Sequence, residues 1–321
     1  MLSLSRNLNS NLTTIMKSNI INLNENVLRA LDFFAENRPP KLDIEKYSLP
    51  FVVGSVNAYN TGTILFSGKA AVFADESSFK SVVQSYKPAI EKGLIRDAII
   101  ISASGEKDSV WEVEVAKQNG LKTTLLTCNA DSSAAKIADQ VLAYRKIAEP
   151  YSYNMSTYLG MMLSVTGEDP AIIKQAIEKL NFPENFSSYE SFSFVLPDRF
   201  VNICPMIETK EHELFGGHLN IRAFSQGHAR HAKFIIPWDK ELVISFDEEN
   251  KYFGDKNHRW DIKLPENANF AAMMSIVYYI CGKIQESKPP YFAENIENYC
   301  NDYGPKAYGM NKPFDVIVPG N

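Results

Sequence analysis

Two serines, a glycine and a lysine follow the end of an apolar run and could together bind an anion. The run is "DAIII" (97–101), and Ser102, Ser104, Gly105 and Lys107 come directly after it. A helical pattern, "DSVWEVEVAKQ", begins next, so its unpaired N–H groups and positive dipole end would face the same place. Hydroxyl donors beside such a helix start suit a phosphate group, and glycine lets the backbone approach it closely.

Lys107 would add a full positive charge to this turn, and Ser109 a further donor. Serine and aspartate are also ordinary helix caps, so the residue types alone leave a purely structural role open. The upstream loop "VGSVNAYNTG" (53–62) ends another apolar run and offers Ser55 and Asn57 as polar side chains. The candidate ligand-binding residues are therefore Ser55, Asn57, Ser102, Ser104, Lys107 and Ser109.

A second group of reactive side chains lies in the stretch 205–238, which holds four of the five histidines. His228 and His231 have an i, i+3 spacing, but no carboxylate spacing completes a zinc motif, so we expect no metal. Glu213 follows Lys210 by three residues, a spacing that also suits an ordinary surface ion pair on a helix. His231 could likewise be a polar residue before a strand.

Apolar runs of strand length alternate with helical patterns along the whole chain, which predicts parallel βαβ units. Runs buried on both faces indicate doubly wound sheets covered by helices on each side. Gly93 and Gly120 lie where helix C-caps belong. The predicted strands are 50–55, 70–74, 97–102, 122–127, 140–144, 193–197, 218–224, 233–238 and 241–246.

Breaks in this alternation divide the chain. A Tyr/Ser-rich and then helical stretch predicts a connector between two α/β units. The helix "FAAMMSIVYYICG" (270–282) is apolar nearly all round and must be covered, which favours a dimer. The irregular tail after it could wrap a neighbouring copy. The expected parts are an N-terminal extension and helix (1–45), a first unit (46–150), a helical connector (151–190) and a second unit with its tail (191–321).

Composition limits the class of protein. The formal net charge of −5 gives no indication of a nucleic-acid or anionic-membrane partner, and no apolar run reaches the roughly 18 residues of a membrane span. The stretch 1–23 is polar and carries Arg6 and Lys17, but a transit peptide would hold more arginine. Because the four cysteines form no CxxC pair, we expect reduced thiols and a cytoplasmic protein.

The segment 101–142 resembles the signature of the sugar isomerase (SIS) domain. That pattern runs strand, S-x-S-G-x-T, helix, A-K-x-x-G, a strand ending in T-x-N, then S-x-x-A-x-x-A-D. The matching residues are Ser102, Ser104, Gly105, Ala116, Lys117, Gly120, Thr127, Asn129, Ser132, Ala135, Ala138 and Asp139. The resemblance implies two tandem SIS units, each a doubly wound parallel sheet of flavodoxin-like order, and a phosphosugar whose phosphate the serines hold.

The chain departs from the SIS pattern at two turns. Lys107 stands where the family has threonine, and a lysine can replace that hydroxyl as a point charge. Val56 and Ala58 stand at the second glycine and the serine of the upstream G-x-G-x-S turn. Because valine favours negative φ, we expect the upstream turn to take another shape.

The second half resembles the isomerase domain of glucosamine-6-phosphate synthase and the phosphoglucose/phosphomannose isomerases. Lys210-x-x-Glu213 matches a K-x-x-E pair, and "RHA" (230–232) falls at the family's K-H-G. The resemblance implies that Glu213 is the base, that Lys210 is its partner and that His231 opens the sugar ring, with His228 as the alternative. It also implies dimers whose active sites are shared, the histidine coming from the other subunit.

These residues suit aldose–ketose isomerisation of a hexose 6-phosphate. A carboxylate can move the proton between C1 and C2 through a cis-enediol, and an imidazole can carry the ring-opening proton. Neither step needs a cofactor. Two alternatives stay open: an enzyme of the glucosamine-6-phosphate deaminase type, and a regulatory protein that binds phosphosugars without turning them over.

Overall fold

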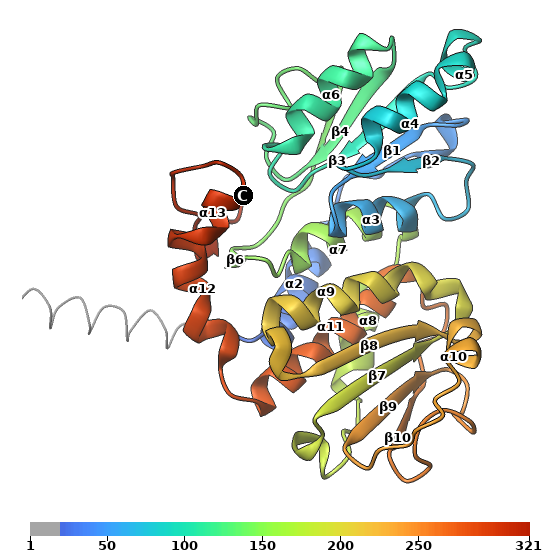
Figure 1. The fold of residues 1–321 in the computed structure, drawn as a ribbon, viewed down its shortest axis with the longest axis vertical. Coiled ribbons are helices and arrows are strands. Elements are labelled where there is room, and N and C mark those ends of the chain that lie inside the picture. Colours follow the sequence, from blue (N-terminus) through green and yellow to red (C-terminus); the bar gives the residue numbers. More distant parts are fainter. Residues whose placement is uncertain (1–19) are drawn as a thin grey trace, which may run out of the picture.

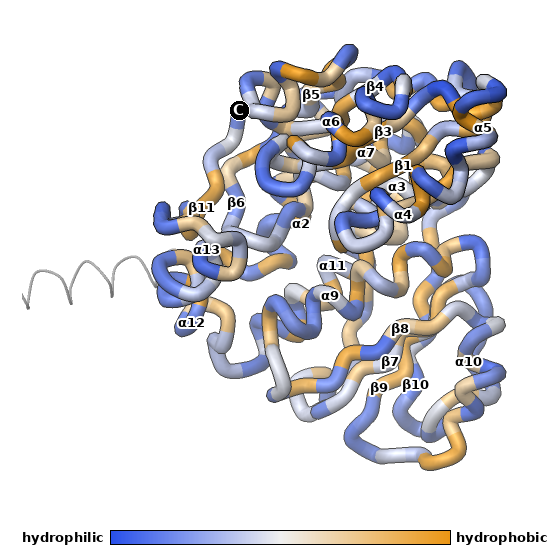
Figure 2. Tube along the Cα trace, turned by 45° about the horizontal axis from the view of Figure 1, so that its top comes forward, coloured by the Kyte–Doolittle hydropathy of each residue, from blue (hydrophilic) through white to orange (hydrophobic). Residues whose placement is uncertain are grey.

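Two α/β units lie one above the other with a layer of helices between them (Figure 1). The computed structural model describes residues 20–321, so the expectation for the N-terminal extension falls outside the described residues as far as residue 19. Apolar segments fill the sheets and the inner helices, whereas polar segments form many of the outer turns (Figure 2). No helix of residues 20–321 has the length and apolar character needed to cross a bilayer.

The first unit contains a five-stranded parallel sheet of order β2-β1-β3-β4-β5. This is the flavodoxin-like doubly wound order, as predicted. Its central strand β3 is buried because its isoleucines pack against helices on both faces. The strands are β1 (Phe51–Gly54), β2 (Val72–Ala74), β3 (Asp97–Ile101), β4 (Lys122–Thr127) and β5 (Gln140–Ala143), and the helices are α3 (Asn57–Leu65), α4 (Phe79–Ser85), α5 (Lys87–Glu91) and α6 (Asp108–Gln118).

The second unit repeats this order without a fifth strand. Its parallel sheet runs β10-β9-β7-β8, so the first strand of each unit lies between the second and the third. A short 3-10 helix and α9 connect β7 to β8. The elements are β7 (Ser191–Leu196), β8 (Asn220–Ser225), β9 (Glu241–Phe246), β10 (Arg259–Ile262), α9 (Cys204–Leu214) and α10 (Gln226–Ala232), with 3-10 helices at Phe186–Ser188, Asp198–Ile203 and Gly216–His218.

The strand predicted at 233–238 is wrong. The segment leaves α10 through two left-handed residues, Lys233 and Phe234, and then runs as a loop. Its apolar side chains are not buried in this chain: Ile235 is 79% exposed and Ile236 is 84% exposed. The fourth strand is β10 instead, whose partly exposed residues carry a weaker apolar pattern.

The layer between the units consists of α2 (Leu23–Glu36), α7 (Met155–Thr166), α8 (Pro170–Glu178) and α11 (Phe270–Ser287). The apolar helix α11 lies at its centre and packs against α2, α7 and α8. Fourteen of its residues are buried within the chain. The helix therefore needs no second copy to cover it, which removes that argument for a dimer.

The C-terminal segment returns to the first unit of its own chain. It forms α12 (Tyr291–Asn301), α13 (Tyr303–Ala307) and β11 (Ile317–Val318). Strand β11 pairs antiparallel with β6 (Glu149–Pro150), at the end of the first unit. The side chain of Asn321 accepts a hydrogen bond from the Lys146 backbone N–H at 2.7 Å. The last residues thus close one side of the space between the units.

Gly282 sets how closely α11 approaches α2. A Cβ at this position would lie 1.9 Å from the Asn24 backbone nitrogen and 2.6 Å from its Cα. We predict that Gly282→Ala lowers the free energy of unfolding by at least about 2 kcal/mol, because backbone atoms cannot move aside cheaply. Urea denaturation measures the change. Gly68→Ala is the control, since a Cβ there meets nothing within 4 Å; equal stability of the two variants would contradict the packing.

Candidate functional site

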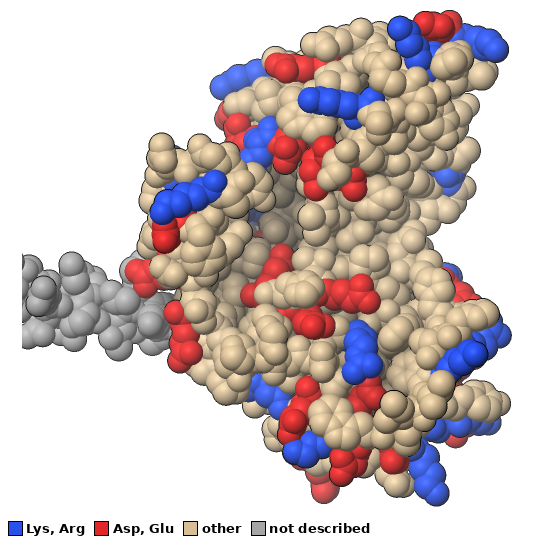
Figure 3. Space-filling model, in the orientation of Figure 1, with Lys and Arg blue, Asp and Glu red and all other residues tan. Residues whose placement is uncertain are grey.

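A cavity of about 1080 Å³ lies between the two units. The space-filling view shows the hollow, with acidic side chains along both of its rims (Figure 3). The ends of β1 and β3 form its upper wall, the end of α9 its lower wall, and α12, α13 and the C-terminal residues its side. Ligand sites of α/β proteins occur at such strand ends and at junctions between domains.

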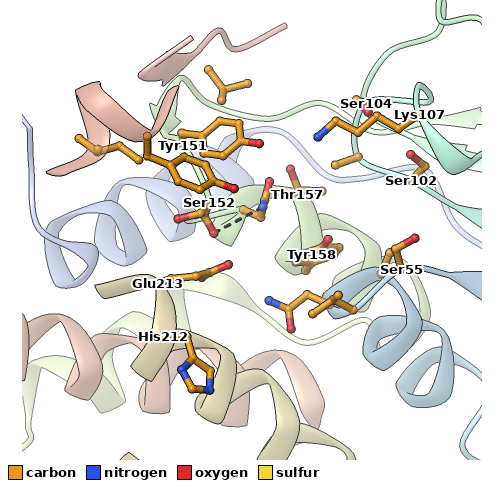
Figure 4. A pocket seen from close by; sticks show the side chains of 18 of the residues that line it. Ser55, Ser102, Ser104, Lys107, Tyr151, Ser152, Thr157, Tyr158, His212 and Glu213 are labelled. Carbon is orange, nitrogen blue, oxygen red and sulfur yellow. Dashed lines mark hydrogen bonds between the residues drawn. The ribbon is translucent and has the colours of Figure 1, made fainter. Parts of the chain in front are cut away.

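The structure brings all six candidate ligand-binding residues to the cavity. They come from two strand ends, β1 and β3, which are neighbours in the sheet. In the close view Ser55, Ser102, Ser104 and Lys107 lie on one side of the cavity, and Glu213 lies on the other (Figure 4). The six residues are Ser55, Asn57, Ser102, Ser104, Lys107 and Ser109.

The turn after β3 prepares two hydroxyl groups for an anion. Ser102 Oγ accepts a hydrogen bond from the Gly105 N–H at 3.1 Å, and Ser104 Oγ accepts from the Glu106 N–H at 3.3 Å. Among residues 20–321 neither hydroxyl donates a hydrogen bond to another group. Each hydroxyl can therefore donate its proton to a ligand. Ser109 differs, because its hydroxyl already donates to the Glu106 carbonyl at 2.8 Å.

The two strand-end turns have nearly the same backbone shape. Val56 has φ 48° and ψ −110°, and Lys107 has φ 59° and ψ −126°. The expectation that Val56 has a negative φ is therefore wrong. A β-branched residue in this region is strained, and such strain persists only where the surroundings impose it, often at functional sites.

The C-terminal segment holds the Lys107 side chain in place. The Lys107 ammonium lies 3.8 Å from the ring centroid of Tyr308 and 4.6 Å from that of Phe314. Burial lowers the pKa of Lys107. Two aromatic rings stabilise the charge in this partly buried place, so the tail fixes the one lysine that follows the serine turn.

Glu213 and Lys210 have different surroundings. Glu213 lies on the cavity wall, whereas Lys210 is fully buried behind it. The Lys210 ammonium pairs with the Glu213 carboxylate and donates to the carbonyls of Ser152, at 2.8 Å, and Tyr153, at 3.1 Å. Burial raises the pKa of Glu213, and Lys210 opposes this shift. Lys210 therefore positions the carboxylate and does not itself face the cavity.

The four histidines of the stretch 205–238 divide between two places. His231 and His228 lie on α10, at the end of β8, and neither lines the cavity of its own chain. His212 and His218 do line it, and His218 stacks on Tyr291 with ring centroids 4.3 Å apart. Among residues 20–321 no three His, Cys, Asp or Glu side chains are grouped as metal ligands would be.

Several residues of the cavity wall carry no signal in the sequence. The tyrosines of the tail come from positions roughly 200 residues from the serine turn, so only the fold brings them there. Glu112 reads as a surface residue of a helix, yet it is 1% exposed and lines the cavity. The further wall residues include His212, His218, Tyr151, Tyr158, Tyr291, Tyr299, Tyr303 and Tyr308.

No family model and no curated protein matches the chain by sequence. Solved structures match it over most of their length. Tagatose-6-phosphate ketose/aldose isomerase from Escherichia coli superposes with a TM-score of 0.57 at 15% identity, over 84% of this chain and 92% of that one. Glucosamine-6-phosphate deaminase from Thermotoga maritima superposes with a TM-score of 0.53 at 16% identity, over 85% and 93%. The chain shares their fold.

A third similar structure is the C-terminal domain of glucosamine-fructose-6-phosphate aminotransferase from Francisella tularensis. It has a TM-score of 0.53 at 12% identity, over 83% of this chain and 93% of that domain. The SIS-like fold expected from the sequence is thus found in full, with both sheets and the helices around them. At these identities the likeness concerns the fold, and the chemistry must be argued from the cavity itself.

The buried Glu112 makes stability depend on pH. Burial, together with Asp108, Glu76 and Asp75, raises its pKa from 4.5 to about 8. Between these values the folded protein holds a proton that the unfolded chain releases, so this contribution is complete below pH 4.5 and is lost as the pH rises to 8. We predict that Glu112→Gln removes this loss, worth about 3–5 kcal/mol in the free energy of unfolding over that range.

Urea denaturation from pH 4.5 to pH 8.5 measures this difference. The control is Glu114→Gln, which changes an exposed carboxyl on the same helix and should follow the wild type. If the free energy of unfolding changed with pH in the same way in the wild type and in Glu112→Gln, the prediction would be contradicted.

Proposed function

We propose that the protein is a phosphosugar isomerase that interconverts an aldose and a ketose hexose 6-phosphate. The observation that carries the proposal is that one cavity holds both a prepared anion site and, across from it, a carboxylate of raised pKa. The printed names of the similar structures, an isomerase and a deaminase of sugar phosphates, support a phosphosugar ligand.

The phosphate would bind at the turn after β3. Ser102 and Ser104 donate their hydroxyl protons, and the first N–H groups of the eleven-residue helix α6 point to the same place. Lys107 supplies the full charge. Because the Tyr308 and Phe314 rings already hold its ammonium, little side-chain freedom is lost when the phosphate binds.

Glu213 would transfer the proton. Its carboxylate removes the proton from C2 of the open-chain aldose, which gives a cis-enediolate. The C2 hydroxyl proton passes to O1, and the carboxyl group then returns its own proton to C1 as the ketone forms at C2. A carboxyl whose pKa is raised by burial exchanges protons with carbon acids more effectively near neutral pH. Lys210, held by the Ser152 and Tyr153 carbonyls, keeps the carboxylate in position.

His231 would open the sugar ring from a second subunit. Within one chain it lies away from the cavity, so this role requires a homodimer with shared active sites. The loop that follows it exposes Ile235, Ile236 and Trp238, at 79%, 84% and 41%, an unusual run of apolar surface that suits a contact between copies.

The four cysteines are buried and unpaired, which supports the expectation of a cytoplasmic protein.

The phosphate site predicts a specific loss of affinity. Lys107→Ala should weaken binding of a hexose 6-phosphate by about 1.5–3 kcal/mol, the range for a charge-assisted hydrogen bond, and should leave binding of the free sugar unchanged. Calorimetry measures both. Lys80→Ala is the matched control, because Lys80 lies over the Trp111 ring at 4.7 Å but outside the cavity wall. Equal wild-type affinity for the phosphorylated and the free sugar would exclude the site.

Shared active sites predict complementation between inactive variants. Glu213→Gln should lower turnover and C2-proton exchange by at least about 10²-fold, as expected for loss of a general base, and His231→Asn should impair turnover of the cyclic sugar. Mixing the two variants should restore about a quarter of wild-type activity, since half of the dimers then have one intact site. Wild-type turnover of His231→Asn would contradict the role of His231, and two inactive variants that regain no activity on mixing would contradict shared active sites.

A further inference from the structure

Tyr151 brings a free hydroxyl group to the cavity. The residue lies where the first unit passes into the connector, and its partly exposed side chain lines the cavity. Among residues 20–321 its hydroxyl group has no hydrogen-bond partner. In the close view Tyr151 lies on the same side of the cavity as Glu213, across from the serines (Figure 4). The hydroxyl group can therefore both donate to a ligand and accept from it.

Contacts with the C-terminal segment hold the Tyr151 ring. The ring stacks on Phe314, with centroids 5.2 Å apart and an angle of 12° between the planes, and the Tyr299 ring centroid lies 5.9 Å away. The Tyr151 backbone N–H also donates to the Val316 carbonyl at 2.8 Å. A side chain that is already held in this way loses little freedom when a ligand binds.

The same contacts link Tyr151 to the phosphate site and to the base. Phe314, on which the Tyr151 ring stacks, also lies 4.6 Å from the Lys107 ammonium. The next residue, Ser152, accepts a hydrogen bond from Lys210, whose ammonium pairs with the proposed base. A sugar held at the phosphate site, with its C1–C2 edge at the base, therefore passes beside the Tyr151 hydroxyl.

The proposed isomerisation contains a step that Glu213 does not perform. After Glu213 takes the C2 proton, the C2 hydroxyl proton must pass to O1 before the ketone can form. A neutral phenol can carry this transfer, because it can donate one proton as it accepts another. Burial raises the pKa of Tyr151, and the Glu213 carboxylate adds to the shift. The phenol therefore keeps its proton at neutral pH.

We propose that Tyr151 is a further catalytic residue, which relays the proton from O2 to O1 of the enediolate. Its O–H bond breaks as the proton binds O1, and its oxygen takes the proton of the C2 hydroxyl in return. The phenol is thus restored, the negative charge moves from O1 to O2, and the ketone forms when Glu213 protonates C1. The inference rests on the proposed function and assigns one further step of it. The Ser152 hydroxyl also faces the cavity, but tyrosine, and not serine, is a usual proton-transfer group of enzymes.

Tyr151→Phe tests the relay, because it removes the hydroxyl group and keeps the ring that stacks on Phe314. NMR of a hexose 6-phosphate in heavy water follows both the exchange of the C2 proton and the formation of ketose. Without the relay, the enediolate takes its proton back at C2. Ketose formation should fall at least about 10²-fold, and the ratio of C2 exchange to ketose formation should rise at least about tenfold.

Two controls accompany this measurement. The affinity of Tyr151→Phe for the hexose 6-phosphate, measured by calorimetry, should equal that of the wild type, because the relay acts only after C2 has lost its proton. Tyr86→Phe removes a tyrosine hydroxyl outside the cavity wall and should leave both rates unchanged.

An unchanged ratio of C2 exchange to ketose formation in Tyr151→Phe would overturn the inference even if turnover falls, because a change in folding or in binding slows both processes together. The proposed function would still stand in that case, since the wild type forms ketose. If the wild type neither exchanges the C2 proton nor forms ketose, the proposed function itself fails, and the inference fails with it.

Discussion

One buried ammonium group, that of Lys210, connects the parts of the molecule on which the cavity depends. It lies on α9 of the second unit and binds the carbonyls of Ser152 and Tyr153, where the first unit passes into the connector. It also lies 5.0 Å from the ring centroid of Tyr278 on α11. A fully buried charge without partners would cost several kcal/mol, so these contacts fix α9, and with it Glu213, relative to the first unit.

Other contacts also hold the two units together at the cavity. The helices α2 and α11 approach closely at Gly282 and form a rigid layer between the sheets. The ends of β1 and β3 therefore face the end of α9 across a fixed gap. The C-terminal segment then crosses back, pairs with β6 and places Tyr308 and Phe314 against Lys107. Both walls of the cavity are thus held by contacts between residues that are distant in sequence.

The sequence predicts the features that depend on local pattern. The βαβ alternation and the turn from Ser102 to Lys107 are local, because strand and helix periodicity and turn residues lie side by side in the chain. The loop 233–240 could not be predicted in this way, because its apolar residues have the composition of a strand but no sheet position within the chain. The turn at Val56 was also missed, since the surrounding structure overrides the preference of valine.

Burial and long-range contacts account for the remaining differences. Lys210 and Glu213 have the spacing of a surface ion pair, and nothing in that spacing shows that one partner is inside the protein. Glu112 on α6 likewise has the sequence pattern of a surface residue, although its side chain is buried. The aromatic wall beside Lys107 depends on the tail returning to the first unit, a contact across about 200 residues that no local pattern encodes.

A crystal structure of the protein with a bound hexose 6-phosphate tests the central claim most directly. We predict that the phosphate group lies between Ser102, Ser104 and Lys107 at the start of α6, with the C1–C2 edge of the sugar toward Glu213. A phosphate bound elsewhere, or a sugar whose C1–C2 edge lies away from Glu213, would contradict it.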